Sequence, residues 1–137
     1  MKTVNTAPTH DAHGSPVRRR ILVLESDRLL RSLLAEWLDM SGNDVLCLAD
    51  SETALARADR FDMVLVDLPT PQRAARQAVS QLRRAMPGTP IVAMSADVTA
   101  SGHAAQEILA RELGAAALLV KPFTRSALLN AMNRARA

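Results

Sequence analysis

Short apolar runs alternate with stretches of helical period along this chain, and this alternation constrains the fold more than any other feature. Ile21 to Leu24 is a continuous apolar run of strand length. Six large apolar residues then follow at the spacing of one helical stripe, namely Leu29, Leu30, Leu33, Leu34, Trp37 and Leu38. Gly42 is the predicted helix stop. The same strand and helix pattern recurs four more times.

The repeat predicts five strands and five helices in alternating order. We expect strands at 21–24, 44–48, 63–66, 91–94 and 116–120. After the first helix, we expect helices at about 51–58, 72–86, 104–113 and from 125 to the end. Continuous apolar strands separated by helices imply a parallel sheet covered on both faces, because parallel strands need crossover helices. The predicted fold class is therefore α/β, with a five-stranded, parallel, doubly wound sheet.

The first part of the chain differs in composition from the rest. It holds Pro, Gly and small polar residues and almost no large apolar ones, so it cannot bury enough surface to offset chain entropy. We expect a disordered tail at 1–18 and one domain at 19–137. No apolar run approaches a membrane span and no secretory leader is recognisable, so we expect a soluble, cytoplasmic protein without a membrane partner.

Two residues, Cys47 and Trp37, are expected in the core. Cys47 is the only cysteine, which excludes a disulfide framework, and it is flanked by leucines in a predicted buried strand. Trp37 lies on the stripe of the first helix. Neither is predicted to bind a ligand.

A sequence pI near 10.0 and a net charge of +3 raise the question of a nucleic-acid partner. However, residues 1–20 hold the whole excess. Residues 21–67 carry four basic and ten acidic side chains, and residues 68–137 carry nine basic and three acidic ones. Aromatic residues that could stack on bases are nearly absent, and no recognisable nucleic-acid-binding motif occurs. A direct nucleic-acid role is therefore disfavoured. The two oppositely charged halves are expected to steer partners.

Polar residues gather where the predicted strands end, and ligands of such sheets bind at that edge. The set is Glu25, Ser26, Asp27, Asp67, Ser95 and Lys121. A carboxylate such as Asp67 at the end of a buried run costs free energy unless an ionic or hydrogen-bonding group meets it. Lys121 is the one lysine after residue 20, and a compact ammonium suits contact with a carboxylate or phosphoryl oxygen.

Two of these positions allow a purely structural role. Asp27 directly precedes the first helix, where Asp is a common N-cap, so it is a candidate for capping as well as for the pocket. Pro122 follows Lys121, and we expect that this peptide bond can be cis and fix the direction of the lysine.

In this order and at these spacings, the residues resemble the receiver domains of two-component response regulators. The resemblance runs from Arg20 to the C-terminus. It rests on Ile-Leu-Val-Leu-Glu-Ser-Asp at 21–27, the run 42–55, Asp-Leu-Pro-Thr-Pro at 67–71, the run 90–96, and Gly-Ala at 114–115 leading to Lys-Pro-Phe at 121–123. It implies the (βα)5 flavodoxin-like receiver fold.

The resemblance also implies a chemistry. Asp67 would accept a phosphoryl group from a sensor histidine kinase or a histidine phosphotransfer protein, and Ser95 and Lys121 would contact that group. Magnesium would be held by Glu25, Asp67 and the backbone carbonyl of Pro69, with Ser26 or Asp27 as further candidates. Such a domain is a signalling protein rather than an enzyme. It acts on a downstream protein target and can form a homodimer through the fourth helix, fifth strand and fifth helix.

Three positions depart from the family pattern and leave two hypotheses for the function. Ser26 replaces the second acidic residue of the metal site, Pro69 has no backbone N–H to give a phosphoryl oxygen, and Leu118 replaces an aromatic switch residue. The first hypothesis is a stand-alone, magnesium-dependent phosphoacceptor read out by protein interaction. The alternative is a degenerate pseudo-receiver that binds proteins independently of phosphorylation.

Overall fold

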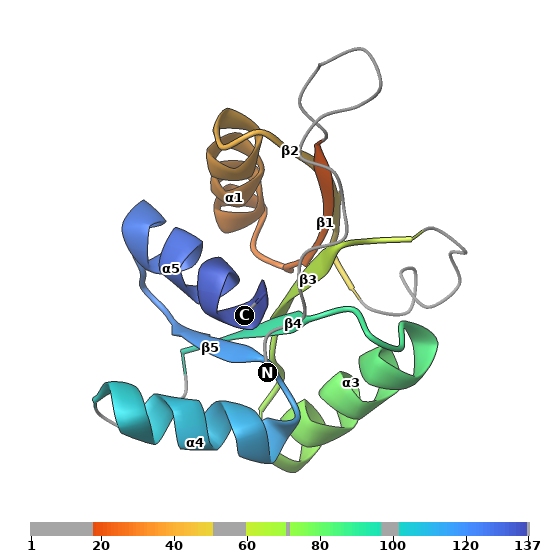
Figure 1. The fold of residues 1–137 in the computed structure, drawn as a ribbon, viewed down its shortest axis with the longest axis vertical. Coiled ribbons are helices and arrows are strands. Elements are labelled where there is room, and N and C mark those ends of the chain that lie inside the picture. The colour runs from red at the N-terminus through yellow and green to blue at the C-terminus, as the bar shows by residue number, and fades with distance from the viewer. Residues whose placement is uncertain (1–17, 51–59, 71, 97–101, 137) are drawn as a thin grey trace.

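A computed structural model describes residues 18–50, 60–70, 72–96 and 102–136 (Figure 1). The elements are β1 (Arg19–Leu24), α1 (Arg28–Met40), β2 (Asn43–Leu48), β3 (Met63–Asp67), α3 (Gln72–Ala85), β4 (Ile91–Ser95), α4 (His103–Leu113), β5 (Ala117–Val120) and α5 (Arg125–Arg136). The helix expected at 51–58 lies outside the described residues, and so does the tail expected at 1–18 apart from its last residue. No helix in the described ranges is long and apolar enough to cross a membrane.

The five strands form one parallel sheet in the order β2-β1-β3-β4-β5. This confirms the predicted parallel, doubly wound sheet. Figure 1 shows α1 and α5 on one face of it and α3 and α4 on the other. The order reverses at β1, which has β2 on one side and β3 on the other. In sheets of this kind a crevice opens at that point, outside the carboxyl ends of the strands.

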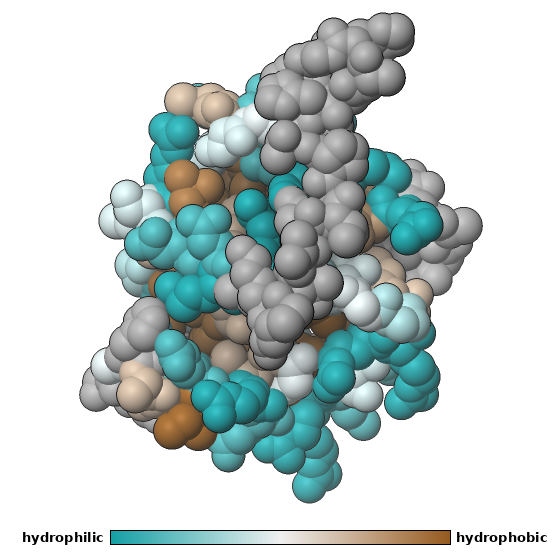
Figure 2. Space-filling model, in the orientation of Figure 1, coloured by the Kyte–Doolittle hydropathy of each residue, from teal (hydrophilic) through white to brown (hydrophobic). Residues whose placement is uncertain are grey.

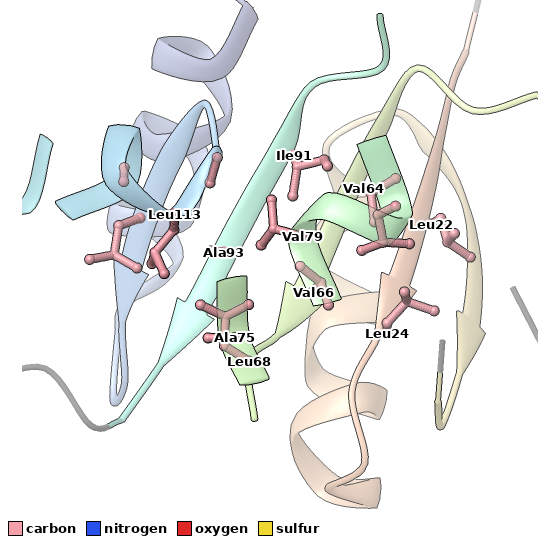
Figure 3. Close-up of a cluster of buried hydrophobic side chains, with 14 of the residues drawn as sticks. Leu22, Leu24, Val64, Val66, Leu68, Ala75, Val79, Ile91, Ala93 and Leu113 are labelled. Atoms are coloured by element: carbon pink, nitrogen blue, oxygen red, sulfur yellow. The ribbon is translucent and has the colours of Figure 1, made fainter. Parts of the chain in front are cut away.

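Two hydrophobic layers cover the sheet, because successive strand side chains point to opposite faces. Leu22 and Leu24 pack with Val79 and Leu82 of α3 (Figure 3 shows part of this layer). Ile21, Val23 and the other strand side chains that point to the opposite face of the sheet pack against α1 and α5. Each central strand is therefore buried on both sides, which is why its sequence is a continuous apolar run.

The apolar stripe of α1 is only half covered by the sheet. Leu34 and Leu38 are fully buried, whereas Leu29 is 82% exposed and Leu33 is 39% exposed. Adjacent helix residues point about 100° apart, so a stripe made of adjacent pairs is wider than the strip that the sheet covers. One edge of the stripe therefore faces solvent.

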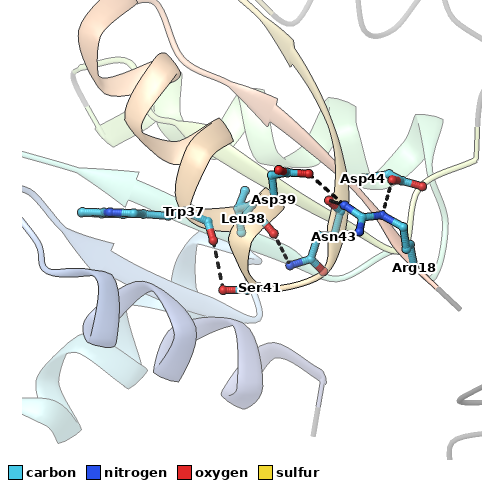
Figure 4. Close-up of polar contacts among 7 residues, drawn as sticks. All are labelled: Arg18, Trp37, Leu38, Asp39, Ser41, Asn43 and Asp44. Carbon is cyan, nitrogen blue, oxygen red and sulfur yellow. Dashed lines mark hydrogen bonds and ion pairs between the residues drawn. The ribbon is translucent and has the colours of Figure 1, made fainter. Parts of the chain in front are cut away.

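Polar contacts fix the end of α1 against the starts of β1 and β2 (Figure 4). Arg18 Nη2 donates to Asp39 Oδ1 at 2.9 Å, and Arg18 Nε donates to Asp44 Oδ1 at 2.5 Å. The buried Asn43 side chain donates to the Leu38 carbonyl at 3.0 Å. One arginine thus joins a helix end and an edge strand at the amino edge of the sheet.

Cys47 and Trp37 are half-buried, which corrects the expectation that both are core residues. Cys47 lies on β2, the edge strand of the described sheet, and burial still raises the pKa of its thiol, although the charge of Arg31 opposes this shift. The Trp37 ring lies against the Phe123 ring, with centroids 6.5 Å apart. Both side chains pack onto the core from its margin.

Neighbouring leucines on α1 provide a test of this packing. Replacing the fully buried Leu34 by Ala should lower the free energy of unfolding by about 2–5 kcal/mol, because a cavity remains. Replacing the exposed Leu33 by Ala should cost about 1 kcal/mol or less. Urea unfolding followed by circular dichroism measures both, and equal losses would contradict the orientation of α1.

Candidate functional site

Strand register brings the predicted site residues to one edge of the sheet. Leu24 pairs with Val66, so Glu25 and Asp67 follow side by side on neighbouring strands. Ser95 ends β4 and pairs with Val120, so Lys121 follows β5 beside it. All four residues therefore lie at the carboxyl edge, on both sides of the β1/β3 crevice.

An ammonium group lies between two carboxylates at the centre of this edge. Lys121 Nζ is 2.7 Å from Glu25 Oε1 and 2.9 Å from Asp67 Oδ1. The Glu25 side chain is 1% exposed, whereas that of Asp67 is 28% exposed. Asp67 is thus the carboxylate of the pair that solvent or a partner can reach.

The environment of Lys121 keeps it protonated. Burial alone would lower the pKa of this ammonium, but the hydrogen bonds and negative charges of Glu25 and Asp67 raise it above the ordinary lysine value. Two carboxylates and one ammonium leave the cluster with one net negative charge. A cation is therefore attracted to Asp67.

Backbone hydrogen bonds hold Glu25 and Lys121 in place. Glu25 Oε2 accepts the backbone N–H of Asp27 at 3.0 Å, and the Glu25 N–H donates to the Leu48 carbonyl at 3.1 Å. The Lys121 N–H donates to the Ser95 carbonyl at 2.9 Å, and the Lys121–Pro122 bond is cis, as the sequence allowed. The two charged residues are therefore fixed at both main chain and side chain.

The other sequence candidates lie around this centre. Ser95 is buried at the end of β4, whereas Ser26 and Pro69 are exposed. Asp27 is the N-cap of α1, and its Oδ1 accepts the N–H groups of Leu29 and Leu30. Its carboxylate therefore serves as the cap of this helix.

Leu118, at the predicted switch position, is 3% exposed and belongs to the hydrophobic layer under α3 and α4. It also lines a cavity of about 330 Å³ together with Arg111 and Arg134. Leucine has no hydroxyl group, so this side chain offers no hydrogen bond at the switch position.

Sequence reasoning missed Arg31. Its Nη1 donates to the Glu25 carbonyl at 2.8 Å and approaches the Ser26 carbonyl at 3.4 Å. It thus anchors the turn that carries Glu25. An arginine in the first turn of a helix opposes the helix dipole, and this was the only signal that the sequence offered.

The residues present fit a magnesium ion with few protein ligands. Glu25 Oε1 is buried and lies 2.7 Å from the ammonium nitrogen of Lys121. In the described residues no group of three or more His, Cys, Asp or Glu side chains could hold a metal. A cation here would meet two carboxylates and keep several waters, which is the coordination that Mg²⁺ accepts more readily than most divalent ions.

Comparison with known proteins decides the family. Residues 21–133 match the family model described as the response regulator receiver domain. The chain belongs to this family. It is a receiver domain of two-component signalling, as its sequence pattern indicated.

Curated relatives are longer than this receiver domain. It is 39% identical over 105 residues to the transcriptional regulatory protein CpxR of Klebsiella pneumoniae, covering 76% of this chain and 43% of the relative. It is 35% identical over 135 residues to the transcriptional regulatory protein PdtaR of Mycobacterium tuberculosis, covering 95% of this chain and 62% of the relative. The chain thus spans about two fifths to three fifths of these relatives.

Solved structures support the same fold. The chemotaxis protein CheY4 of Vibrio cholerae superposes with a TM-score of 0.69 at 25% identity, covering 87% of this chain and 99% of that chain. The receiver domain of a Pseudomonas aeruginosa sensor histidine kinase gives a TM-score of 0.69 at 24% identity, covering 88% and 98%. That structure is described with a magnesium ion coordinated in its active site cleft.

Removing the shared ammonium should destabilise the receiver domain. Lys121→Ala leaves Glu25 buried without a counter-charge, and we expect the free energy of unfolding to fall by about 3 kcal/mol near neutral pH. Adding Glu25→Gln to this variant removes the unpaired charge and should restore most of the loss. Chemical unfolding of the wild type, both single variants and the double variant measures the coupling. A double variant no more stable than Lys121→Ala would contradict this account.

Proposed function

We propose that this receiver domain accepts a phosphoryl group on Asp67 in a magnesium-dependent reaction. The observation that carries the proposal is the ammonium of Lys121 between Glu25 and Asp67. Asp67 is the partly exposed member, so an oxygen of its carboxylate is accessible to a partner. The proposed donor is the phosphohistidine of a sensor histidine kinase or of a histidine phosphotransfer protein.

The transfer requires positioning and charge neutralisation rather than a protein-derived base. An Asp67 oxygen attacks phosphorus, and the new O–P bond forms as the P–N bond to the partner's histidine breaks. The ring nitrogen of the histidine keeps the electron pair of that bond. Lys121, which already contacts Asp67 Oδ1, then pairs with a phosphoryl oxygen, and the hydroxyl of Ser95 at the neighbouring strand end donates to another.

Magnesium would be held by Glu25, Asp67 and the carbonyl of Pro69. It supplies charge neutralisation at the phosphoryl oxygens. Ser26 brings no carboxylate and Asp27 caps α1, so this set has fewer charges than the family pattern. We therefore expect weak magnesium binding that strengthens when the phosphoryl group arrives.

We further propose that the uncovered edge of α1 docks the phosphoryl donor. Leu29, Leu33 and Met40 are exposed large apolar residues on this helix, which begins directly after the site. A partner helix that covers them would bring its histidine near Asp67. The face made by α4, β5 and α5 is the proposed homodimer surface. The downstream target is a second protein, and all these partners imply a cytoplasmic location.

A second candidate function is binding without phosphorylation. Its support is that both carboxylate oxygens of Glu25 are already engaged, one by Lys121 and one by the N–H of Asp27. A buried carboxylate that is already paired with the protein's own lysine can hold one conformation without a ligand. The receiver would then act as an adaptor through the same apolar edge of α1.

Phosphorylation itself separates these two functions. Acetyl phosphate with millimolar magnesium should add one phosphoryl mass to the wild type, detected by intact mass spectrometry, because Asp67 is accessible and paired with Lys121. Asp67→Ala should gain none. A wild type that gains no mass would exclude the phosphoacceptor function and leave the adaptor. A gain in Asp67→Ala would place the modification elsewhere.

The magnesium requirement has its own test at position 26. Ser26→Asp restores a carboxylate beside Glu25 and should lower the magnesium concentration for half-maximal phosphorylation by about tenfold, since ligand charge sets the affinity of such sites. Gln81→Glu adds the same charge on an exposed position of α3 and serves as the control. Equal effects of both changes would mean that only overall charge matters.

A further inference from the structure

A second hollow lies at the opposite, amino edge of the sheet. It has a volume of about 890 Å³ and lies where α3, α4 and α5 end and where β4 begins. Ile91 at the start of β4 lines it, whereas Ser95 at the end of the same strand belongs to the site described above. Four strand steps separate the two, which is about 13 Å along the strand.

Four arginines line this hollow, and no Asp or Glu is among its described lining residues. They are Arg83 and Arg84 of α3, Arg111 of α4 and Arg136 of α5. In the described part of the chain none of the four forms an ion pair, whereas Arg18 and Lys121 each contact two carboxylates. Hydrophilic side chains cover the surface over α3 in Figure 2. No ion pair among the described residues therefore neutralises the positive charge of these four arginines.

The ends of the three helices offset only part of this charge. A helix C-terminus carries about half a negative charge, so three of them supply about one and a half against four full positive charges. Partial burial lowers the pKa of Arg136, the positive charge of Arg19 lowers it further, and the negative charge of Asp62 opposes this shift. A net positive field thus remains at the hollow.

One of the arginines lies close to the backbone of a glycine. Gly114, at the end of α4, has a φ of +85°, and a Cβ atom there would lie 3.1 Å from Arg83 Nη1. The absence of a side chain lets the guanidinium of Arg83 lie against the C-cap of α4. The guanidinium of Arg83 therefore lies next to the end of α4.

We propose that this hollow binds a small polyphosphate, a molecule that carries two or more phosphate groups. Guanidinium groups bind phosphate oxygens through paired hydrogen bonds, and four arginines from three helices line this hollow. The volume lies within the range of small-molecule pockets, about 300–1,000 Å³. Met86 and Pro90 add an apolar wall, and Thr89 adds a hydroxyl group.

A small ligand fits these observations better than a nucleic acid. The arginines line a concave space rather than a ridge, and no aromatic ring is among the described lining residues to stack on a base. Arg73 and Arg76, the exposed arginines at the other end of α3, are not part of the hollow. An extended polyanion would use them too, whereas a small one would not.

Calorimetric titration with magnesium-free pyrophosphate tests the proposal. We expect saturable binding to one site in the wild type, and weakening by at least about tenfold in Arg84→Gln/Arg136→Gln, since two charge-assisted contacts are lost. Both arginines are exposed, so this variant should keep its fold, which its melting temperature checks. Arg73→Gln/Arg76→Gln removes the same charge from α3 outside the hollow and should bind within about twofold of the wild type.

Further measurements separate this site from its alternatives. Asp67→Ala should bind pyrophosphate like the wild type. Binding that instead depends on Lys121 or Asp67 would assign it to the phosphoacceptor site and overturn the proposal. Equal weakening in both arginine pairs would indicate long-range attraction only, and this result or the absence of saturable binding would also overturn the proposal.

Adenosine diphosphate tests whether the ligand extends along the apolar wall. Tight binding of duplex DNA without pyrophosphate binding would refute the small-ligand assignment.

Discussion

The arrangement of the site depends on one ammonium group held between two carboxylates. Glu25 is almost fully buried and Asp67 only partly so, and each would repel the other at neighbouring strand ends without Lys121. The three residues come from β1, β3 and the end of β5, so the contact also joins elements that are not adjacent in the sheet. The contacts of Lys121 stabilise two carboxylates at one edge of the sheet. They also place an ammonium group beside the carboxylate that is proposed to accept a phosphoryl group.

The strands and the location of the site could be predicted from the sequence because both follow from local patterns. Continuous apolar runs indicated strands buried on two faces, and the polar residue after each run marked the edge where Glu25, Asp67 and Lys121 meet. Asp27 was left open between a cap and a pocket residue, since both need a carboxylate before a helix. Only the hydrogen bonds to Leu29 and Leu30 distinguish the two roles.

Other features could not be predicted because they depend on neighbours distant in sequence. The exposure of Leu29 and Leu33 follows from how much of α1 the sheet covers, and the half-burial of Cys47 follows from β2 lying at an edge. Arg31 gave no pattern, because its partners are backbone carbonyls of a turn. The four arginines of the amino-edge hollow are spread over more than fifty residues, and only the packing of three helix ends collects them.

The contact between Trp37 and Phe123 gives the protein an internal optical probe. Trp37 is the only tryptophan of the chain, and Phe123 follows directly on the Lys121–Pro122 bond. The indole therefore rests on the turn that carries the ammonium of the site, while belonging to α1, the helix proposed to dock a partner. Emission from this one residue reports movement of the turn and coverage of the helix, so both events can be followed in the unlabelled protein.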